Sequence, residues 1–102
     1  MDIKIIKSPS AGTLEILTRR KGSGKEALEG IDAVGLVQGR MIEMIVATDI
    51  AEKAVGVTVE DIKGSCPQNM IMIAIFGDTA SVESALKEIR DSQKEGKYDV
   101  NS

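Results

Sequence analysis

An uninterrupted apolar run over residues 70–76 constrains the fold of this 102-residue chain more than any other feature. A loop centred on Cys66-Pro67 precedes the run, and a Gly77-Asp78 turn follows it directly. Such a run fits a strand that is covered on both faces, although periodicity by itself leaves a buried helix open. As a strand, it requires other elements on both sides of the sheet.

Apolar spacing predicts the remaining elements. Apolar and polar residues that alternate indicate strands, and apolar residues three and four positions apart indicate helices. Asp78 is placed to cap the second helix, and the apolar stripe of that helix consists of Val82, Ala85, Leu86 and Ile89. In chain order we expect strands at residues 2–5, 13–18 and 32–38, a helix at 41–54, strands at 55–59 and 70–76, and a helix after residue 78.

This order of elements predicts an α+β fold, an α/β sandwich in which helices pack on a mostly antiparallel sheet. The chain length fits one domain over residues 1–102. Within it we expect N-terminal strands over residues 1–18 and a core over residues 32–90. Residues 91–102 form a polar tail, with one short strand predicted near residues 98–100.

Composition narrows the function. Histidine is absent, which removes the commonest general base and transition-metal ligand. The net charge is -3 and only Phe76 and Tyr98 are aromatic, so no nucleic-acid partner is expected. No stretch of about 18 apolar residues exists to span a membrane, and residues 1–10 lack the apolar run of a signal peptide. We therefore expect a cytoplasmic protein that is not an enzyme.

Cys66 is the one position of chemical interest. The residues alone leave a buried structural cysteine, a redox thiol and a metal ligand open. It lies in a loop beside a proline and small residues, where burial is less expected, and Cys-Pro recurs at iron–sulfur ligands. One chain supplies one thiolate whereas a cluster needs several. Any cluster therefore has to lie on an oligomer's symmetry axis, where copies of Cys66 converge.

Two segments resemble those of bacterial microcompartment shell proteins. Residues 47–57, ATDIAEKAVGV, look like the helix-to-strand segment of that family. Residues 77–86, GDTASVESAL, look like the opening of its second helix, with Gly-Asp, a small residue and then Val-x-x-Ala. The resemblance covers about residues 32–90, and the order and spacing of the motifs make it specific.

The N-terminal part is similar to the circularly permuted class of this family, found in ethanolamine and propanediol compartments. An ordinary member carries its last strand after the second helix. In the permuted class an N-terminal strand fills that place in the sheet, and here the resemblance assigns it to residues 13–18.

The loop GSCPQ, residues 64–68, matches the Gly-x-Cys-Pro-Gln signature of permuted shell proteins from glycyl-radical enzyme compartments. That subgroup is known for an iron–sulfur cluster at the pore. The resemblance implies that Cys66 is the metal ligand and that four neighbours shape the pore loop: Gly64, Ser65, Pro67 and Gln68. The implied cofactor is a 4Fe-4S cluster shared between subunits, with electron transfer or pore gating as its alternative roles.

The same resemblance implies a mode of assembly. Lys53 aligns with a lysine that lies along the edge between neighbouring hexamers, whereas by itself it is a solvated helix-end lysine favoured by the helix dipole. The implied protein is a homo-hexamer that tiles the shell with other shell proteins around encapsulated enzymes. One alternative is a small ferredoxin-like regulatory domain that binds a metabolite and builds no shell. A third hypothesis is a thiol enzyme that uses Cys66 as its reactive group.

Overall fold

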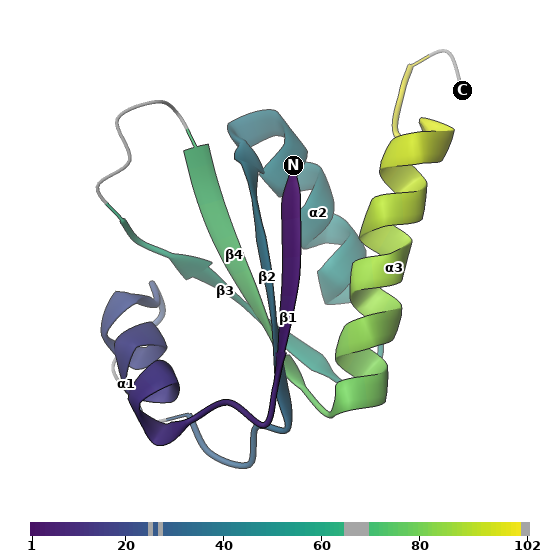
Figure 1. Ribbon diagram of the computed structural model, residues 1–102. Coiled ribbons are helices and arrows are strands. Elements are labelled where there is room, and N and C mark those ends of the chain that lie inside the picture. The colour runs from purple at the N-terminus through teal and green to yellow at the C-terminus, as the bar shows by residue number, and fades with distance from the viewer. Residues whose placement is uncertain (25, 27, 65–69, 101–102) are drawn as a thin grey trace.

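The computed structural model describes residues 1–24, 26, 28–64 and 70–100. Figure 1 shows one antiparallel sheet with helices on both of its sides. The predicted α+β fold class is confirmed. In chain order the elements are β1 (Asp2–Lys7), α1 (Ala11–Arg20), β2 (Ala33–Arg40), α2 (Met41–Lys53), β3 (Val57–Ile62), β4 (Met70–Gly77) and α3 (Thr79–Glu95).

The apolar run forms β4, a central strand of the sheet. The strand order is β1-β2-β4-β3, so β4 pairs along both of its edges. Ile73 and Ile75 pack in the cluster that contains α2 and α3, while Ala74 and Phe76 pack in a second cluster with α1. Because side chains alternate between the faces of a strand, both sets are buried and the run contains no polar residue. The prediction of a doubly covered strand is confirmed.

Helices α2 and α3 cover one face of the sheet (Figure 1). The predicted stripe of α3 is buried in full, from Val82 to Ile89. The Asp78 carboxylate accepts a hydrogen bond from the Ser81 backbone N–H at 2.9 Å, which confirms the predicted cap. A Cβ at Gly35 of β2 would lie 2.9 Å from Leu86 Cδ2, so glycine permits the close approach of α3.

Residues 13–18 belong to helix α1, so the strand predicted there is wrong. Ser10 Oγ accepts a hydrogen bond from the Thr13 backbone N–H at 3.2 Å and caps the start of the helix. Leu14 and Leu17, three residues apart, pack against the sheet face opposite to α2 and α3. Ile16 is exposed, and its alternation with Glu15 imitates a strand over too few residues to separate the two periods.

The N-terminal strand β1 is an edge strand of the sheet, in the order β1-β2-β4-β3. It pairs antiparallel with β2, and Ile5 lies opposite Gly35. Ile3 and Ile5 pack against the cluster under α3.

The C-terminal segment also differs from expectation. Helix α3 continues to Glu95, inside the predicted tail, and ends at Gly96 in the left-handed conformation with φ 63°. Residues 98–100 form turns and a bend, so the short strand predicted there is wrong. Tyr98 instead donates a hydrogen bond to Asp49 of α2. None of the helices in the described ranges has the length and apolar content needed to cross a membrane.

Candidate functional site

The two predicted sites lie at opposite ends of β3. Lys53 ends α2, a few residues before β3 begins, and the predicted pore loop follows the other end of that strand. The register pairs Ile62 with Met72, so the loop joins paired ends of β3 and β4. Among the loop residues the structure describes Gly64. The other predicted members lie outside the described residues: Ser65, Cys66, Pro67 and Gln68.

Gly64 is exposed, as is Lys63 before it. A Cβ built on Gly64 would meet no atom of the described residues within 4 Å. Packing against the described residues therefore does not require a glycine at position 64.

The C-terminal end of α1 is hydrogen-bonded to the strand that enters the loop. The Lys63 N–H donates to the Arg20 carbonyl at 2.7 Å, and the Arg20 guanidinium donates to the Lys63 carbonyl at 3.2 Å. The Gly22 N–H donates to the Asp61 carbonyl at 2.9 Å, and Lys21 forms an isolated antiparallel bridge to the same strand. The end of β3 is thus held by β4 on one edge and by the end of α1 on the other.

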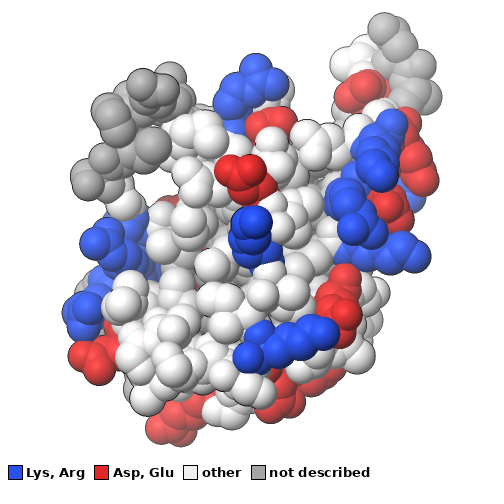
Figure 2. Space-filling model, viewed as in Figure 1, with Lys and Arg blue, Asp and Glu red and all other residues white. Residues whose placement is uncertain are grey.

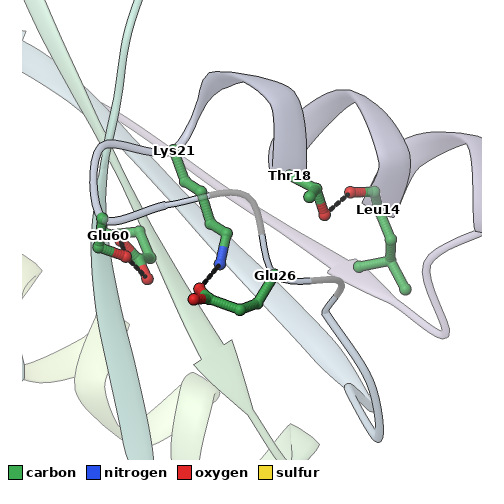
Figure 3. Close-up of polar contacts among 6 residues, drawn as sticks. Leu14, Thr18, Lys21, Glu26 and Glu60 are labelled. Atoms are coloured by element: carbon green, nitrogen blue, oxygen red, sulfur yellow. Dashed lines mark hydrogen bonds and ion pairs between the residues drawn. The ribbon is translucent and has the colours of Figure 1, made fainter.

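Two side-chain contacts order the segment after α1, one within the segment and one to β3 (Figure 3). The Lys21 side chain is 5% exposed, and its ammonium lies 3.7 Å from the Glu26 carboxylate. The Ser23 hydroxyl donates to the Glu60 carboxylate at 2.7 Å. Because a buried lysine needs a charged partner, Glu26 keeps this segment beside the end of α1.

The donor chemistry of one chain limits any metal site. In the part of the chain that the structure describes, no group of three or more Cys, Asp or Glu residues is placed to hold a metal ion. That part of the chain does not include Cys66. The sequence holds one cysteine and no histidine, so a thiolate site that uses Cys66 needs ligands from other copies.

At the other end of β3, Lys53 belongs to a three-residue network. Its ammonium donates to Asp49 Oδ2 at 2.8 Å, and the Tyr98 hydroxyl donates to the same oxygen at 2.9 Å. The hydrogen bond from Lys53, followed by that from Tyr98, lowers the pKa of Asp49. The bond to Asp49 in turn raises the pKa of Lys53 and that of Tyr98.

Sequence reasoning identified Lys53 but missed the other two members of the network, Asp49 and Tyr98. The Asp49–Lys53 spacing of four residues on a helix is a signal for an ion pair and could have been used. Tyr98 is 49 residues away from Asp49 and carries no such signal.

A groove of about 280 Å³ lies between α2 and α3 beside this network. Ile42, Val46, Ile50 and Ile89 contribute apolar side chains to it, and Tyr98 lines it as well. The sequence did not predict the groove because it depends on how the two helices pack.

Exposed apolar side chains gather on the first half of α2. Met41, Ile42 and Ile45 are 52%, 72% and 64% exposed. Arg40 pairs with Met70, so this part of α2 begins at the loop end of the sheet. Figure 2 shows the opposite side of the molecule from this part of α2; there uncharged side chains cover much of the face, with one basic and one acidic side chain near its middle. Exposed apolar groups of this kind are typical of interaction surfaces.

Comparison with known proteins identifies the family. The family model for the BMC domain matches residues 33–102, and this chain belongs to the BMC domain family. It is accordingly a microcompartment shell protein, from a family whose members are structural. The resemblance predicted from residues 47–57 and 77–86 is confirmed.

Two solved structures define the relationship further. The chain is similar to the ligand-free GrpU microcompartment shell protein from Clostridiales bacterium 1_7_47FAA, with 57% identity and a TM-score of 0.74 over 94% of this chain and 95% of that chain. It is also similar to the ligand-free GrpU microcompartment shell protein from Pectobacterium wasabiae, with 32% identity and a TM-score of 0.69 over 87% and 99% of the two chains. No curated protein matches the sequence.

Proposed function

We propose that this chain is a hexameric tile of the microcompartment shell. Its copies form a ring, the loop over residues 64–68 surrounds the central pore, and Lys53 lies at the lateral edge between rings. The observation that carries the proposal is the 57% identity over 94% of the chain with a microcompartment shell protein. The exposed apolar residues at the start of α2 support it, because they lie at the loop end of the sheet, where neighbouring subunits of a ring approach each other.

A circularly permuted connection is part of this proposal. The edge strand that pairs with β2 is β1, which precedes the matched BMC region, and no strand follows α3 in the described residues up to 100. This arrangement supports a sheet in which an N-terminal strand takes the place of the family's last strand.

Cys66 is proposed as the ligand of a 4Fe-4S cluster on the ring axis. The donor set of one chain fits a shared cluster, because each copy brings one thiolate. Six copies present more thiolates than a cubane cluster has irons, so we expect some of them to remain unligated. The bonds from the end of α1 fix where the loop leaves β3. When bound, such a cluster supplies one-electron transfer.

Anaerobic purification with iron and sulfide analysis tests the cluster. We expect the parent protein to be brown and to contain iron and sulfide in equal amounts. Cys66→Ser should lose both while it keeps the size of the oligomer. Ser65→Ala is the matched control, because it changes the same loop and retains the thiol.

Different results would contradict the two parts of the proposal, the iron–sulfur cluster and the shell tile. A parent ring that stays colourless and free of iron after reconstitution rules out the cluster and leaves a tile with a small polar pore. A dimer or trimer that binds a metabolite and never forms sheets rules out the tile and favours the ferredoxin-like alternative.

A further inference from the structure

We infer that Asp49 and Tyr98 are positioning residues for Lys53, so that the turn after α3 controls how the edge of the ring makes lateral contacts. The inference rests on the edge role proposed above for Lys53. It adds a part of the chain, the C-terminal turn, that neither the family resemblance nor the sequence pattern connects with assembly.

The geometry centres on one oxygen atom. Asp49 Oδ2 accepts hydrogen bonds from the Lys53 ammonium at 2.8 Å and from the Tyr98 hydroxyl at 2.9 Å. A free lysine side chain samples many rotamers, and ordering it at an interface costs entropy. Asp49 holds the ammonium one helical turn back along α2. The Lys53 side chain is therefore already partly ordered before two rings come into contact, and it loses less conformational entropy when they do.

Tyr98 is itself held in place by the end of α3. Gly96 adopts the left-handed conformation and ends the helix, and the Asp99 N–H donates to the Gly96 carbonyl at 3.0 Å. The Lys97 N–H donates to the Ser92 carbonyl at 3.3 Å. This turn directs the Tyr98 hydroxyl across the groove to α2, so the orientation of Asp49 depends on a segment outside its own helix.

The exposure of the network argues against a role in holding the fold together. The Lys53 and Asp49 side chains are 72% and 43% exposed, and ion pairs at the surface contribute little to stability. Assembly is a different case, because every edge of every ring repeats the contact and a small change per subunit is multiplied. A change at Tyr98 should therefore affect sheet formation and leave the ring intact.

The test compares the lowest protein concentration at which sheets form, measured by sedimentation and electron microscopy. Tyr98→Phe removes the hydroxyl and keeps the ring that lines the groove. We expect it to raise the threshold several-fold, with an unchanged ring on size exclusion and an unchanged Tm. Asp49→Asn should raise the threshold as well, and Lys53→Ala should raise it the most.

A double variant and a matched control make the test specific. Tyr98→Phe combined with Lys53→Ala should behave like Lys53→Ala alone, because Tyr98 acts through Lys53. Gln93→Ala is the control. It removes another hydrogen bond between α3 and α2, the 3.1 Å bond from Gln93 to Glu43, and does not touch the network. Its threshold should equal that of the parent.

The other possible outcomes contradict either the edge role of Lys53 or the positioning role of Tyr98. If Lys53→Ala forms sheets as well as the parent, the edge role of Lys53 fails, and the inference fails with it. If Lys53→Ala is impaired and Tyr98→Phe is not, the edge role stands and the inference alone is wrong. A Tyr98 effect that persists in the Lys53→Ala background, or that comes with a lower Tm, assigns Tyr98 to the fold.

Discussion

At the residue scale, Gly77 marks a place where the backbone leaves no room for a side chain. A Cβ at Gly77 would lie 2.6 Å from the Gly56 carbonyl oxygen, and a backbone atom cannot move aside as a side-chain end can. Gly77→Ala should lower the free energy of unfolding by about 1–3 kcal/mol, as overpacking does. Urea unfolding at one protein concentration measures this.

Gly12→Ala is the matched control for Gly77→Ala. A Cβ there meets no atom of the described part of the chain within 4 Å, and the residue lies in α1. Its free energy of unfolding should rise or stay within about 1 kcal/mol of the parent value. Equal destabilisation by both substitutions would contradict the steric explanation.

Tyr98 gives a spectroscopic test at the same scale. It is the single tyrosine in a chain without tryptophan, so the ultraviolet absorbance of tyrosinate reports it alone. The hydrogen bond to Asp49 raises the pKa of Tyr98 above its ordinary value of 10.0. The contribution of this exposed hydroxyl to stability is small. Because the folded pKa exceeds the unfolded one, that contribution is complete below the unfolded pKa. It is lost as the pH rises through the folded pKa.

Titration of the native and the urea-unfolded protein measures this difference. The native transition should lie at higher pH than the unfolded one, and Asp49→Asn should lower it towards the unfolded position. Coincident native and unfolded transitions would mean that the hydroxyl does not bind Asp49 in solution.

At the element scale, the segments with a long, one-sided or fully apolar pattern were predictable. β4 and the stripe of α3 each bury many side chains, so their periodicity follows directly from the packing. Helix α1 was not predictable in this way. Leu14 and Leu17 are its main contribution to the core, and the stretch between them fits the two-residue period of a strand as well as the helical period of about 3.6 residues. The Ser10 cap was a usable signal for a helix that the pattern of alternation concealed.

The contacts between the end of α1 and β3 lead to a prediction for the ion pair of Lys21 with Glu26. Glu26→Gln removes the counter-charge of a side chain that is 5% exposed. Since Glu26 itself is largely exposed, we expect a loss of about 1–2 kcal/mol, between the values for surface and buried pairs. Lys21→Met keeps the volume, removes the charge and should be nearly neutral.

Urea unfolding and amide hydrogen exchange check this prediction. The Gly22 and Lys63 amides form the hydrogen bonds between the end of α1 and β3. In Glu26→Gln their hydrogen exchange should speed up relative to the parent by more than that of the β4 amides. If Lys21→Met is the more destabilising of the two variants, the ion pair is not what keeps the segment in place.

At the scale of the whole molecule, the sheet separates the two proposed sites. β3 has six residues, so the loop and the Lys53 network lie about 20 Å apart along the strand direction. The proposed tile needs this separation, because in it the loop end of each subunit lies towards the ring axis and the Lys53 end lies towards the neighbouring rings.

The motif around Cys66 could be recognised from the sequence because it is local, and the role of Cys66 as a ligand stays a prediction. The attachment of Tyr98 to Asp49 could not be recognised in this way, because it joins positions 49 residues apart through the packing of α2 and α3. The groove between those helices escaped prediction for the same reason.

Native mass spectrometry of anaerobically prepared protein tests the central claim most directly, because it counts chains and clusters in one particle. We predict six chains with one 4Fe-4S cluster for the parent, and six chains without a cluster for Cys66→Ser. A smaller assembly, or one cluster for each chain, would contradict the account of a ring of subunits that shares one cluster on its axis.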